Sequence, residues 1–139
     1  MEYFIYLVPV FAIVGLIVMA FKAKWVIKQD AGEKNMLELA SHIKEGALAF
    51  LSAEYRVLII FVVIAGALLA LVSSLIESTS YFIVVAFVIG AFFSALAGNI
   101  GMRIATEANV RTTQAARTSL PDALKVSFTG GMGMGLGVA

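Results

Sequence analysis

Three long runs of apolar residues, none containing a charged side chain, dominate the chain. They cover residues 3–21, 57–76 and 78–102 and are 19, 20 and 25 residues long. A bilayer core is about 30 Å thick and takes roughly 20 apolar residues of helix to cross, so each run predicts a membrane span. Another uncharged stretch starts at about Val126 and ends after 14 residues, which is too short to span. We interpret it as the first part of a truncated fourth span, and the chain as a fragment of a larger bundle.

The polar stretches between the runs also predict helices. From Glu33 onward one helical face is apolar, and the helical spacing continues into the second run with only Gly46 as an interruption before it. The apolar face consists of Met36, Ala40, Ile43, Ala47, Phe50 and Leu51. One helix from Met36 to Ile76 would be about 60 Å long, twice the hydrocarbon thickness. The excess length predicts a cytoplasmic domain made of helix ends.

The end of the third run repeats this pattern. Arg103, Glu107 and Arg111 follow at a spacing of four, which gives the acid a basic neighbour one turn away on each side. The sequence TSLPD then ends the helix, and Ser119 with Asp122 resembles a capping box that starts a new helix at about Leu120. The expected fold class is therefore an all-α, multi-pass transmembrane helix bundle with helices extended into the cytosol.

Two residues predict local irregularities near the start of the chain. Pro9 lies inside the first run, where proline predicts a kink instead of a break. Gly32 lies in the sequence KQDAGEK, which predicts the first loop.

Composition and charge placement agree with a membrane protein. Hydrophobic residues make up 61% of the chain and charged residues 14%, where soluble domains have about a quarter charged. All ten Lys and Arg residues fall in 22–56 and 103–125, so the positive-inside rule places both stretches in the cytoplasm and the amino terminus outside. Basic residues follow the first run instead of preceding it, which favours an uncleaved span over a signal peptide. The absence of cysteine excludes disulfides and thiolate metal sites.

Few residues are candidates for chemistry. Glu38, His42 and Glu45 are spaced so that they could surround a metal ion, but the adjacent Lys44 and the lack of a second ligand cluster favour a solvated helix face. Glu54 and Arg56 flank Tyr55 at the predicted water boundary, where they are expected to pair or to extend toward water.

Asn99 lies near the cytoplasmic end of the third run. It could line a pathway, although an interhelical hydrogen bond is the commoner role. No acidic or basic residue lies inside any run, whereas ion-translocating proteins usually carry one there. We therefore predict no catalytic, cofactor-binding or metal-binding residue in this chain.

Small residues recur at a spacing of four in the third run and near the carboxyl end. The third run has Ala86, Gly90, Ser94 and Gly98, and the last stretch pairs Gly131 with Gly135 and Gly133 with Gly137. Such faces let helices approach closely in lipid, and we favour packing over a flexible segment that lines an ion path. The sequence GGMGMGLG lacks the strand, spacing and lysine of a phosphate-binding loop.

Three segments resemble a known family. They are IKEGALAFLSAEYRVL (Ile43 to Leu58), GNIGMRIATEANVRTTQAAR (Gly98 to Arg117) and ALKVSFTGGMGMGLGVA (Ala123 to Ala139). All three are similar to the amino-terminal part of the membrane-integral pyrophosphatases, and the middle segment is the most specific. The resemblance covers the chain from about Met36 to its end.

The resemblance implies a sixteen-helix homodimer in the cell membrane that hydrolyses pyrophosphate with Mg²⁺ and, in one branch, K⁺. It implies that hydrolysis drives the export of Na⁺ or H⁺, and the local sequence is closest to the Na⁺-pumping branch. The family's Asp-rich catalytic motif is absent here, so the resemblance assigns no site residue and implies a scaffold role. The alternative is a small non-enzymatic membrane subunit that acts as a scaffold, and the reading frame beyond Ala139 would distinguish the two.

Overall fold

Every regular element in the described part of the chain is an α-helix. The computed structural model describes residues 4–76 and 80–138, and it contains no strand within these ranges. The helices are α1 (Phe4–Ile27), α2 (Lys34–Leu75), α3 (Phe82–Ala116) and α4 (Leu120–Val138). Helices α1, α2 and α3 are long and apolar enough to cross a membrane. The predicted all-α fold class is confirmed, while residues 77–79, where the second apolar run ends and the third begins, lie outside the described residues.

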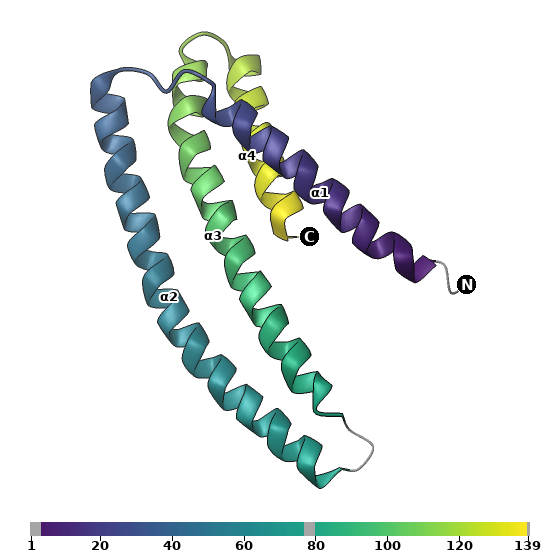
Figure 1. The fold of residues 1–139 in the computed structure, drawn as a ribbon. Coiled ribbons are helices and arrows are strands. Elements are labelled where there is room, and N and C mark those ends of the chain that lie inside the picture. Colours follow the sequence, from purple (N-terminus) through teal and green to yellow (C-terminus); the bar gives the residue numbers. More distant parts are fainter. Residues whose placement is uncertain (1–3, 77–79, 139) are drawn as a thin grey trace.

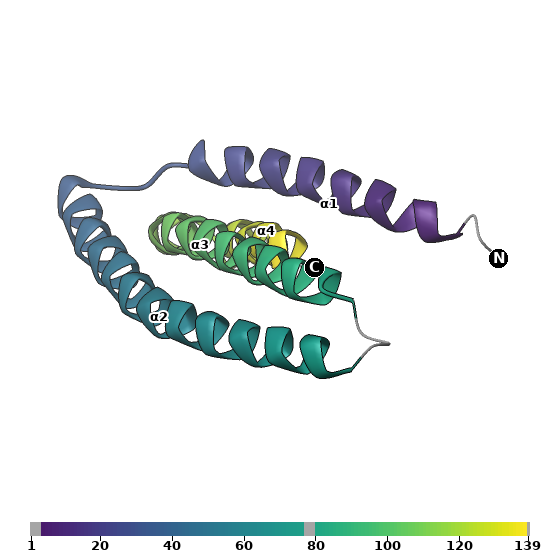
Figure 2. The same ribbon diagram turned by 60° about the horizontal axis from the view of Figure 1, so that its bottom comes forward.

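Helix α3 occupies the centre of the arrangement. It runs antiparallel to α2 on one side and to α4 on the other (Figure 1). Seen from the second direction, α3 and α4 lie between α1 and α2 (Figure 2). Helix α1 leans away toward its amino end (Figure 1), and one of its contacts with α4 is at Gly15, where an added Cβ would lie 3.9 Å from the Leu136 carbonyl oxygen. The polar ends of the helices therefore converge while their apolar ends diverge.

The long second helix is confirmed as one unbroken element. Helix α2 has 42 residues, so at a rise of about 1.5 Å per residue it is about 60 Å long. Gly46 does not interrupt it. Helix α3 likewise continues past the end of the third apolar run, to Ala116. The division of these helices into membrane and cytoplasmic parts stays a prediction from the sequence.

The two predicted irregularities near the start of the chain both lie in the described residues. Helix α1 continues through Pro9, so the proline does not break the helix, while the kink expected there stays a prediction. The connection from α1 to α2 contains Gly32 at φ +86°, a left-handed conformation that a side chain would strain. The Asp30 carboxylate accepts the backbone N–H of Gly32 at 2.9 Å, which stabilises this tight turn.

Glycines allow α3 and α4 to pack closely. A Cβ added at Gly130 would lie 2.6 Å from the Cβ of Ala108, and one at Gly133 would lie 3.5 Å from the side chain of Ile104. A Cβ added at Gly137 would lie 2.7 Å from the sulfur of Met19 in α1. The expected packing role is therefore confirmed for Gly133 and Gly137. The segment is helical to Val138, without an unwound stretch or a phosphate-binding loop.

Two other glycine faces point away from the described residues. Gly131 and Gly135 have no described atom within 4 Å of an added Cβ, so their predicted pairing face is not part of the α3–α4 contact. A Cβ added at Gly90 or Gly98 on α3 would likewise have no described atom within 4 Å. The helix contact predicted for the strip formed by Ala86, Gly90, Ser94 and Gly98 is thus not made within this segment and stays a prediction.

Candidate functional site

The most developed polar cluster centres on Glu107, near the carboxyl end of α3. Lys44 of α2 donates to one carboxylate oxygen at 2.7 Å, and Arg111 donates to the other at 2.6 Å. Arg111 also donates from Nε and Nη2 to the Ile27 carbonyl, at 3.3 and 3.1 Å. Since that carbonyl lies at the carboxyl end of α1, the cluster joins three helices, and the guanidinium satisfies a group that a helix end leaves free.

The charge environment of Glu107 favours its ionised form. The hydrogen bond from Lys44 lowers the pKa of Glu107 most, and Arg111 lowers it further, while partial burial opposes both. The sequence predicted Arg103 and Arg111 as the two basic neighbours of Glu107 along α3. Arg111 fills that role, but Arg103 does not: its Nε donates instead to the Asn99 side-chain oxygen at 2.7 Å. Lys44, far away in the sequence, takes its place.

A second group of polar contacts holds the α1–α2 connection against the end of α3. The Gln114 amide donates to Asp30 at 2.9 Å, and Arg117 donates to Glu33 at 2.8 Å. The backbone N–H of Gly32, followed by Gln114, lowers the pKa of Asp30. Both pairs are exposed, so each contributes little to stability, but together they connect the α1–α2 loop to the end of α3.

The start of α4 lies next to this group. Its predicted capping box forms in part, because the Asp122 N–H donates to the Ser119 hydroxyl oxygen at 3.2 Å. The Asp122 carboxylate accepts the Ser119 hydroxyl, at 2.6 Å, and not the Ser119 backbone N–H of a full capping box. On the next turn, the Lys125 ammonium lies 5.5 Å from the centroid of the Trp25 ring, within cation–π range.

A cavity of about 220 Å³ opens among these groups, between the ends of α1, α3 and α4. Asp30 and Asp122 line it together with Arg111 and Lys125. Two acids and two bases therefore balance each other on its wall, and both Asp30 and Arg111 are already hydrogen-bonded. This arrangement suits a structural junction more than the binding of an anion or a cation.

The structure also places the remaining candidates from the sequence. His42 and Glu45 approach to 3.8 Å but are 67% and 77% exposed, as on a solvated helix face. Among residues 4–76 and 80–138, no three His, Cys, Asp or Glu side chains gather as metal ligands would. Neither Glu54 nor Arg56 forms an ion pair with any described residue, and both are exposed, which agrees with the second expectation, that they extend toward water.

The interhelical hydrogen bond that the sequence suggested for Asn99 is made by Tyr55 instead. Asn99 bonds to Arg103 on its own helix, so the interhelical bond expected for it is not formed among the described residues. The interhelical bond comes from Tyr55 of α2, whose hydroxyl donates to the Ala95 carbonyl of α3 at 2.6 Å. Sequence reasoning passed over Tyr55, although a tyrosine at a span boundary is a known candidate for a polar anchor.

Comparison with known proteins identifies the chain's relatives. The family described as "Inorganic H+ pyrophosphatase" matches residues 13–139. The K⁺-insensitive pyrophosphate-energized proton pump 2 of Moorella thermoacetica is 42% identical over 132 residues, covering 95% of this chain and 19% of that protein. The putative K⁺-stimulated pyrophosphate-energized sodium pump of Clostridium tetani is 40% identical over 136 residues, which cover 98% of this chain and 19% of that protein. The K⁺-stimulated pyrophosphate-energized sodium pump of Thermotoga maritima is 36% identical over 138 residues, which cover 96% of this chain and 18% of that protein. The chain spans about a fifth of the length of these relatives.

Proposed function

The chain belongs to the inorganic H⁺ pyrophosphatase family, and on that premise we propose that it is part of a membrane pump driven by pyrophosphate hydrolysis. The observation that carries the proposal is the family match over residues 13–139. The three helices long enough to cross a membrane agree with it. Because the chain spans about a fifth of its relatives, the activity is proposed for the whole protein that contains this segment.

Reconstitution of the whole protein into liposomes tests the proposed activity. Pyrophosphate added outside should be hydrolysed in a Mg²⁺-dependent reaction and should drive ion uptake into vesicles whose pumps face outward. Hydrolysis without ion uptake, or neither activity in a folded preparation, would contradict the proposal. A homodimer is also proposed from the family resemblance, and light scattering of the detergent-solubilised protein measures it.

We propose Na⁺ as the exported ion, with H⁺ as the competing outcome. The resemblance of the local sequence to the Na⁺-pumping branch and the match to the clostridial sodium pump support Na⁺. The similar identity to a proton pump makes this the first point to measure. Uptake of ²²Na⁺ that persists with a protonophore and increases with K⁺ is expected. Pyrophosphate-driven acidification without ²²Na⁺ uptake would assign H⁺ and a K⁺-insensitive pump instead.

Within the pump, we infer a supporting role for this segment. Mg²⁺ takes carboxylate oxygens as protein ligands, but Glu107 and Glu33 are paired with bases, and no three acidic or histidine side chains gather among the described residues. The residues present do not fit a Mg²⁺ site, so Mg²⁺ and K⁺ are proposed to bind elsewhere in the whole protein. Accordingly, the double variant Glu38→Gln/Glu45→Gln should keep its Mg²⁺-dependent phosphate release, and loss of that release would place a site on α2.

We also propose the membrane orientation that the basic residues favour, with the amino terminus outside and the convergent polar ends in the cytoplasm. Cysteines introduced at Lys28 and at Ser80 test it, since both positions are exposed. An impermeant thiol reagent added to intact cells should label position 80 and not position 28. The opposite labelling would reverse the orientation without affecting the family assignment.

A further inference from the structure

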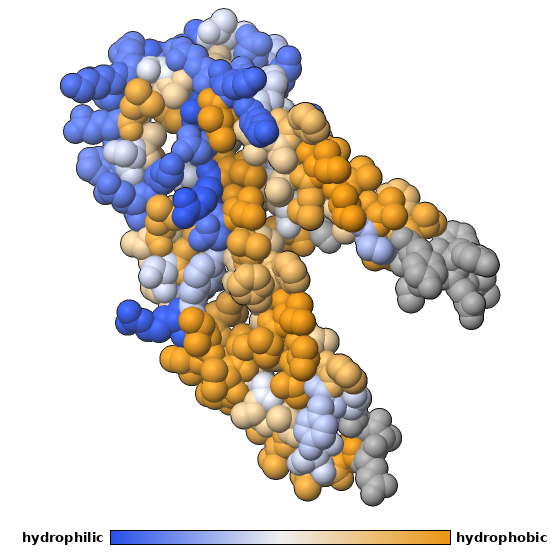
Figure 3. All heavy atoms as spheres, in the orientation of Figure 1, coloured by the Kyte–Doolittle hydropathy of each residue, from blue (hydrophilic) through white to orange (hydrophobic). Residues whose placement is uncertain are grey.

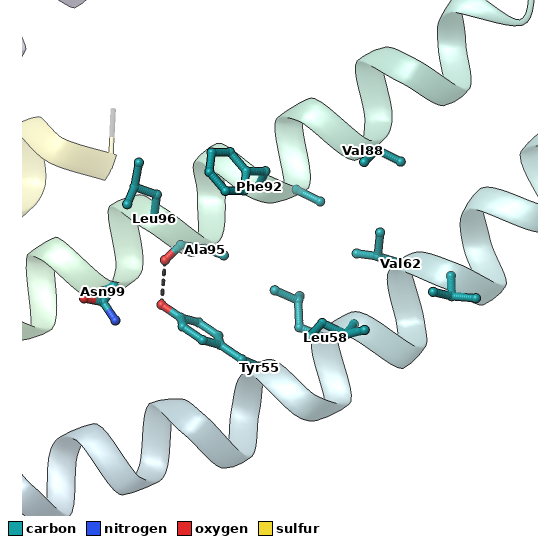
Figure 4. Close-up of a pocket in the computed structure, with 11 residues that line it drawn as sticks. Tyr55, Leu58, Val62, Val88, Phe92, Ala95, Leu96 and Asn99 are labelled. Atoms are coloured by element: carbon teal, nitrogen blue, oxygen red, sulfur yellow. Dashed lines mark hydrogen bonds between the residues drawn. The ribbon is translucent and has the colours of Figure 1, made fainter.

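The membrane halves of α2 and α3 enclose an apolar groove of about 440 Å³. Leu58 and Val62 line it from α2, and Val88 and Phe92 line it from α3 (Figure 4). The polar side chains of its lining are Tyr55 and Asn99, and both lie at the same end (Figure 4). The volume falls within the range of about 300–1,000 Å³ that is typical of small-molecule sites.

Arg103 follows directly beyond the polar end of this groove. It is one helical turn past Asn99, and its Nε donates to the Asn99 side-chain oxygen at 2.7 Å. Asn99 lines the apolar groove, while Arg103 lines a second cavity of about 180 Å³. Arg103, Lys44 and Glu107 line this second cavity. The two terminal guanidinium nitrogens of Arg103 have no partner among the described residues. Lys44 and Arg111 are already paired with Glu107, so the exposed guanidinium of Arg103 is the unpaired positive charge next to the polar end of the groove.

The change from an apolar lining to a cationic end coincides with the end of the uncharged run 78–102. That position is the predicted cytoplasmic boundary of the membrane, where anionic lipid headgroups lie. Basic pockets between membrane helices on this side are typical binding sites for anionic headgroups. A helix from elsewhere in the protein would cover the apolar part of the groove, but it would not by itself neutralise the free side of Arg103.

We propose that the groove binds one acyl chain of an anionic phospholipid, with the phosphate of its headgroup held by Arg103. The acyl chain would lie along Leu58, Val62, Val88 and Phe92, and the headgroup would lie at the level of Asn99 and Arg103. The proposal rests on the membrane orientation proposed above, but it does not depend on the pumped ion or on the substrate.

Photo-crosslinking in the whole protein tests this site. The probes are phosphatidylglycerol and phosphatidylcholine that carry the same acyl-chain diazirine, and mass spectrometry maps the labelled peptides. Phosphatidylglycerol should label the groove more strongly than phosphatidylcholine. Arg103→Gln should reduce phosphatidylglycerol labelling about fivefold, the effect of removing one basic side chain at an anionic surface. Arg103→Lys should keep most of the labelling, which separates loss of charge from loss of fold.

Arg56→Gln is the matched control, because Arg56 is exposed near the same boundary but, unlike Arg103, forms no hydrogen bond to Asn99 or another described residue that lines the groove. It should leave the labelling unchanged. Equal labelling by the two lipids, or equal effects of Arg103→Gln and Arg56→Gln, would overturn the proposal. So would an unlabelled groove in which cysteines at Val62 or Val88 crosslink to another segment of the protein. Phosphate release from the same preparations is scored separately, so a failure of the proposed pump activity is distinguishable.

Discussion

The two ends of this helical segment are held together in different ways. At the convergent polar end, Glu107 joins α2, α3 and the end of α1, and Arg117 with Glu33 attaches the loop. At the divergent end, α2 and α3 face each other across the apolar groove, and the Tyr55–Ala95 bond lies at its polar edge. Figure 3 shows the same division, with hydrophilic side chains gathered at the convergent end and hydrophobic ones covering the helices beyond it.

The difference shows which part of the segment can organise itself. Charge-assisted hydrogen bonds are directional and are completed within this chain, so the polar end defines how the helices meet. Apolar surface gains nothing by leaving lipid for another apolar surface, so membrane helices need small-residue faces or polar anchors to associate. The α3–α4 glycine contact is of that kind, whereas the open strip that contains Gly90 and Gly98 is available to a neighbour.

Removal of the central carboxylate should produce the largest loss. Glu107→Gln weakens two charge-assisted hydrogen bonds and leaves Lys44 and Arg111 without a counter-charge. We expect a loss of about 3 kcal/mol in stability, measured as a lower melting temperature of the whole protein in detergent. Glu45→Gln is the control, since that side chain is 77% exposed and should change stability by less than about 0.5 kcal/mol. Equal melting of the two variants would mean that the polar end is not the organising part.

The same carboxylate should make stability dependent on pH. Because its partners lower the pKa of Glu107 in the folded state, its contribution is present above the ordinary glutamate pKa of about 4.3 and is lost as pH falls through the folded value. The melting temperature of the parent should therefore decrease in acid below about pH 5 more steeply than that of Glu107→Gln. Parallel curves for the two proteins would exclude a stabilising role for the ionised form.

The glycine contact offers a test on two adjacent residues. Gly130→Ala places a methyl group 2.6 Å from the Cβ of Ala108, so we expect a cost of about 2 kcal/mol from overpacking. Gly131→Ala meets no described atom within 4 Å and should be neutral or should stabilise the helix by up to about 1 kcal/mol. Adding Ala108→Gly to Gly130→Ala should restore part of the loss. Melting curves of the four proteins measure this, and a costly Gly131→Ala would reveal a neighbour on the other face.

The smallest effect is expected in the apolar half of α2 and α3. Tyr55→Phe removes the hydroxyl that bonds to the Ala95 carbonyl, and interhelical hydrogen bonds in membranes contribute about 0.6 kcal/mol on average. Tyr81→Phe is the control, because Tyr81 is 62% exposed and its hydroxyl has no partner among the described residues. A melting shift for Tyr55→Phe as large as that for Glu107→Gln would remove the contrast between the two halves.

The sequence by itself determined the helices. The predicted helix from Met36 to Ile76 corresponds to α2 at Lys34–Leu75, and the helix expected from about Leu120 begins there. These features depend on apolar runs, helical spacing and capping residues, all of which act between residues a few positions apart. The same local signals predicted the all-α fold class, and the short motif around Gly98 to Arg117 led to the family.

Only the tertiary structure decided which side chains meet. Spacing along α3 suggested Arg103 as a partner for Glu107, but Lys44, 63 residues away, takes that position. A repeat of four glycines suggested two equivalent faces on α4, yet Gly133 is buried while Gly131 and Gly135 are open. Periodicity defines the faces of a helix, but not how the helix is rotated against its neighbours or which distant residue reaches it. Those choices depend on contacts between helices far apart in the chain, and these contacts exist only once the helices have packed.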